Sequence, residues 1–178
     1  CLRLSALVTC WIIFGLVHQA ESQSRSNNIV VAHGVDLESQ NPHWHNTTAN
    51  YAVWRHFLEP LAEYDFAKRR YVGVLAESWT GSEKGWTFKL RRNVLFHNGA
   101  EMTAADVIYS LKRSMDPKLS RQINLARSIQ SMQAPDPYTV VITTTKPVVS
   151  LLEYFDNVYI LSEAAARESG DEATFGKK

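Results

Sequence analysis

The sequence predicts a mixed α/β fold whose strands pair mainly antiparallel. Short β-branched or alternating apolar runs, bounded by turn residues, indicate strands, and longer stretches with helix-start signals lie between them. The 178 residues are 45% apolar and 21% charged, which is ordinary for a folded domain. The net charge is only +1, and cations and anions are interleaved, so nucleic acid is not an expected partner.

The first twenty residues differ from the rest. Arg3 precedes an uncharged run from Leu4 to Val17, and as a helix these residues would rise only ~21 Å, short of a ~30 Å hydrocarbon core. We therefore expect residues 1–20 to be a signal peptide cleaved after Ala20, although His18 suits such a site poorly. A buried N-terminal helix is the alternative, but the segment has no polar face.

Both cysteines, Cys1 and Cys10, fall inside this leader. The mature protein would then have no disulfide and no cysteine metal site. Thr9 before Cys10 does not suit lipoprotein processing, so a lipid anchor is not expected there.

The next elements are a strand, a loop and a helix. The strand is expected at 29–32, and a Pro-containing loop at 36–46 follows it. Asn46, Thr47 or Thr48 can cap a helix that runs to about Glu59. The helix should turn one side to the core, which carries Tyr51, Trp54, Phe57 and Leu58.

Short strands separated by turns come next, at 61–64, 78–80, 86–91 and 94–96. The segment 86–91 alternates apolar and polar residues, which is the period of a half-buried strand. Asn98-Gly99 favours a tight turn.

Thr103 and Asp106 mark the start of a helix that should reach Met115, with Thr103 as cap and Asp106 in the first turn. The remaining expected elements are a helix at 120–129, a turn at 136–137, a strand at 138–145, a helix at 147–155, a strand at 158–161 and a helix at 163–169.

Several motifs in this order resemble the peptide/nickel class of bacterial periplasmic solute-binding proteins, solute-binding family 5. They are Leu75-Ala-Glu-Ser-Trp79, Trp86-Thr-Phe-Lys-Leu-Arg91, Val94-x-Phe-His-Asn-Gly99, Met102-Thr-Ala-Ala-Asp-Val107, Tyr109-Ser-Leu-Lys-Arg113 and Asp136-Pro-Tyr-Thr-Val-Val-Ile142. The resemblance extends from about Ile29 to Lys178. A Pro-x-Gly-Thr-Gly-Pro-aromatic segment usually follows in this family, so we expect this chain to be an N-terminal fragment.

The resemblance implies the N-terminal part of a type II periplasmic binding-protein fold, with the extra small domain of the peptide-binding class. Residues 21–60 would begin the large lobe, 61–172 would form the small α/β domain, and 173–178 would return to the large lobe. It further implies a periplasmic, monomeric, non-enzymatic component of an ABC importer, without a cofactor. That component would capture a peptide or similar small solute and deliver it to permease and ATPase subunits, meeting the membrane only through the permease.

Relatives in this family bind dipeptides, longer peptides, glutathione, nickel chelates or sugars, and all remain open here. In the family, the end of the first strand, the loop before the first helix and part of the small domain reach the ligand. The candidate ligand-binding residues are therefore His33, Gly34, Asn46, Thr47, Thr48 and Gln122. The alternative for the asparagine and the threonines is a purely structural role as helix caps.

Two other classes of site can be considered from the residues. His33, His43 and His45 are a possible metal cluster, but loop histidines without a defined ligand set are more simply solvated or hydrogen-bonded.

For a secreted hydrolase, His97 and Asp106 could be base and orienting acid, with Ser78 or Ser110 as nucleophile. No nucleophile motif surrounds either serine, so neither a catalytic nor a metal site is expected.

Overall fold

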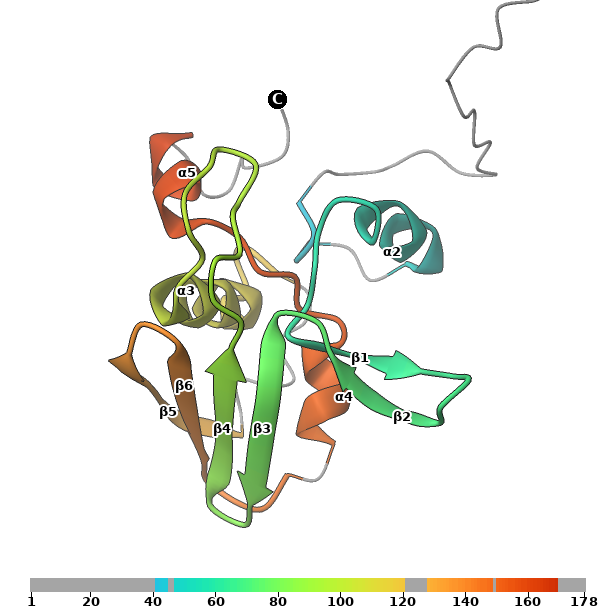
Figure 1. The fold of residues 1–178 in the computed structure, drawn as a ribbon, viewed down its shortest axis with the longest axis vertical. Helices are drawn as coiled ribbons and strands as arrows, with labels where there is room; N and C mark the ends of the chain where they lie inside the picture. The colour runs from blue at the N-terminus through green and yellow to red at the C-terminus, as the bar shows by residue number, and fades with distance from the viewer. Residues whose placement is uncertain (1–40, 45–46, 121–127, 149, 170–178) are drawn as a thin grey trace, which may run out of the picture. The chain divides into compact units, whose positions relative to one another are not determined.

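A four-stranded antiparallel sheet is the centre of the computed structural model (Figure 1). Its strands are β3 (Ala76–Ser82), β4 (Gly85–Leu90), β5 (Ile129–Asp136) and β6 (Thr139–Thr144), in the order β3-β4-β6-β5. The structure describes residues 41–44, 47–120, 128–148 and 150–169, all of which belong to one compact unit. The fold is mixed α/β with antiparallel pairing, as the sequence predicts.

The alternation predicted for 86–91 is confirmed in β4. Phe88 and Leu90 are buried, whereas Lys89 between them is exposed. Phe88 pairs with Trp79 on β3 and with Val140 on β6, so apolar side chains from three strands share one face.

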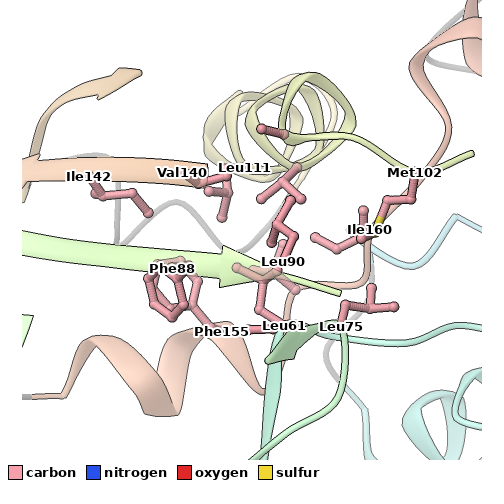
Figure 2. Close-up of a cluster of buried hydrophobic side chains, with 14 of the residues drawn as sticks. Leu61, Leu75, Phe88, Leu90, Met102, Leu111, Val140, Ile142, Phe155 and Ile160 are labelled. Carbon is pink, nitrogen blue, oxygen red and sulfur yellow. The ribbon is translucent and has the colours of Figure 1, made fainter. Parts of the chain in front are cut away.

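That face holds most of the core (Figure 2). The 12-residue helix α3 (Ala104–Met115) places Leu111 beside Val140 and Leu90. The short helix α4 (Leu151–Phe155) packs the ring of Phe155 against the sheet. The rings of Phe155 and Phe88 meet edge to face with centroids 5.0 Å apart.

A separate two-stranded hairpin consists of β1 (Ala62–Asp65) and β2 (Arg70–Gly73), with Tyr64 opposite Tyr71. The sequence predicts the first strand but not the second. In Figure 1 the hairpin extends away from the four-stranded sheet, and α4 packs against β1.

Helix α2 (Thr48–Trp54) is shorter than predicted, since it ends at Trp54 and not at Glu59. Trp54 is fully buried, but Phe57 beyond it is 45% exposed, so the predicted core stripe is wrong at that residue. The chain turns at 55–57, which allows Pro60 and Leu61 to enter the core.

Two predicted strands, 94–96 and 158–161, are reduced to isolated bridges between Leu95 and Glu101 and between Pro60 and Tyr159. At the second of these bridges, the Ile160 N–H donates to the Glu59 carbonyl at 3.1 Å. The helix predicted at 120–129 is wrong at its last residue, because Ile129 begins β5.

Helix α5 (Glu163–Glu168) agrees with the prediction, with Ser162 as its cap. Within the described ranges, no helix has the length and apolar character needed to cross a bilayer. The predictions for 1–40, 121–127 and 170–178 fall outside the described residues.

Candidate functional site

Thr47 and Thr48 stand at the start of α2, and both are exposed. Thr47 has an extended backbone, and its Oγ1 accepts a hydrogen bond from the Asn50 N–H at 3.4 Å, so it is the helix cap. Thr48 is the first helical residue and does not carry the cap. The first turn has no acidic residue, so this end of the helix presents hydroxyl groups without a fixed charge.

The other candidates, His33, Gly34, Asn46 and Gln122, lie outside the described residues. The structure thus brings together Thr47 and Thr48 of the predicted set.

A buried polar cluster anchors the chain just before α2. Asn41, His43 and Arg113 are each at most 3% exposed. The Arg113 guanidinium donates to Asn41 Oδ1 at 2.8 Å and lies 3.2 Å from His43 Nδ1. Asn41 Oδ1 also accepts from the His43 N–H at 3.1 Å. The sequence does not predict this cluster, because Arg113 lies some 70 residues from Asn41 and His43 in the chain.

The cluster defines the tautomer of His43. Its Nε2 lies 3.0 Å from the Tyr159 carbonyl oxygen, which can only accept, so Nε2 carries the proton. Nδ1 is then an acceptor, which matches the Arg113 donor beside it. Burial and the Arg113 charge lower the pKa of His43 to about 3, so the ring is neutral near pH 7.

Both nitrogens of His43 are therefore used in holding the fold, which supports the structural alternative over a metal ligand. His33 and His45 lie outside the described residues. Within the ranges that are described, no three His, Cys, Asp or Glu side chains are grouped as a metal site would need.

Helix α2 packs through an aromatic cluster formed by Tyr51, Trp54 and Tyr159. The rings of Tyr51 and Trp54 meet edge to face at 5.8 Å, and the Trp54 ring lies 6.1 Å from that of Tyr159. In the described part of the chain, Asn50 Nδ2 and Trp54 Nε1 are buried without a hydrogen-bond partner. Packing, more than side-chain hydrogen bonding, therefore holds this helix in place.

Asp106 and Ser110, two of the possible catalytic residues, have structural roles. The Asp106 carboxylate accepts from the N–H and hydroxyl of Thr103, both at 2.9 Å, and from the Glu163 N–H at 3.0 Å. Ser110 Oγ is buried, donates to the Asp106 carbonyl at 2.8 Å and accepts from the Leu161 N–H at 2.8 Å. These bonds fix helix α3 to the start of α5.

The other two residues weighed for catalysis, His97 and Ser78, are exposed on a loop and on β3. A cavity of about 310 Å³, which the sequence does not predict, lies between the chain after α2 and the loop at 94–97. His97 lines it together with His56, and so do the exposed apolar side chains of Phe57 and Leu95. No local pattern in the sequence indicates this cavity, because Leu95 lies between Val94 and Phe96, and Phe57 lies beside Leu58, as core residues would.

The chain resembles known proteins in both sequence and fold. Residues 70–178 match the model of the bacterial extracellular solute-binding proteins, family 5 (middle part). The glutathione-binding protein GsiB of Escherichia coli O6:K15:H31 (strain 536) is 32% identical over 176 residues, which cover 96% of this chain and 34% of that protein. The chain thus spans about a third of the length of the curated relatives it matches.

Solved structures of periplasmic binding proteins have a similar fold. The solute-binding protein MoaA of A. tumefaciens R10, in complex with mannopinic acid, aligns with a TM-score of 0.70 and 33% identity over 79% of this chain and 30% of that one. The periplasmic binding protein DppA of Helicobacter pylori aligns with a TM-score of 0.71 over 82% of this chain and 33% of that one, and at 24% identity it supports the fold alone. The predicted periplasmic binding-protein fold of type II is confirmed. The family that the motifs indicate is confirmed as well, and the chain belongs to the bacterial extracellular solute-binding proteins of family 5.

Proposed function

We propose that the protein containing this chain is the extracytoplasmic substrate-binding component of an ABC importer, which captures peptides or related small solutes and delivers them to a membrane permease. The family match over residues 70–178, together with the periplasmic binding-protein fold, is the observation that carries the proposal. The named relative GsiB is a glutathione-binding protein, and MoaA was solved with mannopinic acid, which favours a small peptide or a related small solute.

The proposed protein has four segments along this chain. Residues 1–20 are a signal peptide, 21–60 begin the large lobe, 61–172 form the small α/β domain, and 173–178 return to the large lobe. The protein acts as a monomer in the periplasm and performs no chemistry of its own. Closure of the two lobes around the ligand precedes delivery to the permease and its ATPase.

The proposed ligand contacts from this chain are His33, Gly34, Asn46, Thr47, Thr48 and Gln122. The structure supports a role for Thr48 in particular, because its side chain is exposed while the neighbouring Thr47 caps the helix. An uncharged hydroxyl suits the amide groups of a peptide, which both donate and accept hydrogen bonds.

Two measurements on the complete gene product test these proposals. Native mass spectrometry of the purified protein should show a co-purified peptide or glutathione-like solute, and a metal chelate would instead favour the nickel-type members of the family. Calorimetric titration with the identified solute should then show roughly 3- to 10-fold weaker binding for Thr48→Val, which removes one hydrogen bond and keeps the shape.

Thr80→Val is the matched control, because Thr80 is exposed on β3, where a β-branched residue is tolerated. Equal affinities of the wild type and both variants for the solute would show that Thr48 does not contact it. The absence of binding to any peptide-like solute in the wild type would contradict the proposed function itself.

A further inference from the structure

The turn of the β1–β2 hairpin exposes an aromatic ring. Phe66 is 82% exposed, more than Phe57 or Leu95, the other large apolar residues exposed in the described ranges. Its ring meets that of Tyr64 edge to face at 5.1 Å, and Tyr64 in turn meets Tyr71 at 5.3 Å. The exposed ring is therefore the outer end of an ordered aromatic row that belongs to the two strands.

The same turn is positively charged. Lys68, Arg69 and Arg70 are all exposed, and Asp65 is the one carboxylate in the turn. Asp65 accepts from the backbone N–H of Lys68 at 2.9 Å and from its ammonium group at 2.8 Å. Neither arginine forms an ion pair with any residue that the structure describes. The backbone of Arg69 has a φ of +52°, which marks the point where the chain reverses.

We propose that this hairpin turn is a contact site for a phospholipid surface with anionic headgroups. Aromatic side chains favour the membrane–water interface, and Arg and Lys beside them are attracted to anionic lipids. The three features needed are present together: a protruding ring, two unpaired guanidinium groups and strands that hold them.

The size of the turn favours lipid over a protein partner. The exposed residues are 66–70, at the end of a hairpin that extends away from the four-stranded sheet (Figure 1). Five residues are far fewer than the roughly 20–30 that each partner contributes to a stable protein interface of standard size. A lipid surface needs no complementary shape, so a small tip is sufficient for a weak, salt-sensitive contact.

Vesicle flotation tests the proposal, with the gene product recovered as the cell processes it, so that the N-terminus is the same in every sample. The probe is a vesicle of phosphatidylcholine with roughly one third phosphatidylglycerol, compared with pure phosphatidylcholine. The wild type should bind the anionic vesicles at low salt and lose binding as salt rises. The double variant Arg69→Glu/Arg70→Glu should bind on the order of 20-fold more weakly, because each arginine near an anionic surface contributes about 5-fold.

Matched controls separate the turn from overall charge and hydrophobicity. Lys84→Glu/Lys118→Glu makes the same change in charge at exposed residues in other turns and should leave binding unchanged. Phe66→Ser should weaken binding several-fold, whereas Leu95→Ser at another exposed apolar residue should not. Thermal unfolding confirms that each variant is folded.

Three results would overturn the proposal: no wild-type binding to anionic vesicles, equal loss in the turn and control variants, or turn variants that impair solute uptake while vesicle binding stays intact. The last result would assign the turn to a protein partner. The two vesicle-binding outcomes do not depend on any solute, so they test this proposal separately from the proposed function.

Discussion

Arg113 donates a hydrogen bond to Nδ1 of His43 at 3.2 Å, and both side chains are almost inaccessible to water. The other ring nitrogen of His43, Nε2, donates a hydrogen bond to the carbonyl oxygen of Tyr159. Three segments far apart in the chain, at residue 43, on α3 and after α4, thus share one imidazole ring.

Replacing His43 should therefore destabilise the fold. In His43→Ala the Tyr159 carbonyl loses its donor and the buried Arg113 loses an acceptor, so we expect a loss of about 2–4 kcal/mol in the free energy of unfolding at neutral pH. Urea denaturation measures it. His97→Ala, at an exposed histidine, should change stability by less than about 0.5 kcal/mol, and a comparable loss in the two variants would contradict the role assigned to His43.

Acid should weaken the same cluster. The pKa of His43 is about 3 in the folded protein against 6.5 as its ordinary value, so the unfolded chain binds the extra proton first. The stability that His43 contributes is complete above pH ~6.5 and is lost as the pH falls toward ~3. The difference in unfolding free energy between wild type and His43→Ala should shrink by roughly 2.5 kcal/mol between about pH 6 and pH 4. A difference that stays constant would show that His43 is not buried in its neutral form.

Two glycines should respond differently to the addition of a methyl group. Gly85 has a φ of +143°, and a Cβ there would collide with the carbonyl oxygen of Ile142 on the neighbouring strand. Gly99 has a φ of +83°, but a Cβ there would meet open space. Gly99→Ala should cost about 1–2 kcal/mol for the left-handed backbone alone, and Gly85→Ala at least ~3 kcal/mol. Thermal and urea unfolding of the pair would show this order, and the reverse order would mean that β4 and β6 do not approach as described.

Local chemistry explains which parts of the fold could be predicted from the sequence. Helix α3 is predictable because Thr103 stands at its cap position and Asp106 lies in its first turn. Strand β4 is predictable because its alternation is uninterrupted. Strand β5 is not, because register shifts after Ile129 and Gln133 break its alternation. A period that changes twice in eight residues indicates neither strand nor helix.

The candidate site shows the same division. The sequence predicts a helix cap at Asn46, Thr47 or Thr48, and the structure places it at Thr47. The burial of His43 does not follow from any local pattern, because Tyr159, which it bonds, is 116 residues away. A polar loop histidine and a buried one are identical in sequence until the distant partners are known.

The order of strands in the sheet also determines which strand pairs can form first as the chain folds. β4 is central, but its partner β6 lies across α3 and β5 in the chain, so that Trp86 meets Ile142. As the chain emerges N-terminus first, β4 therefore lacks that partner until the residues up to β6 have emerged as well. Over this interval the β3–β4 hairpin carries Phe88 on an uncovered face beside an open edge, which is the state most prone to pair with another chain. A factor that holds nascent chains apart should therefore matter most for this protein between the emergence of β4 and that of β6.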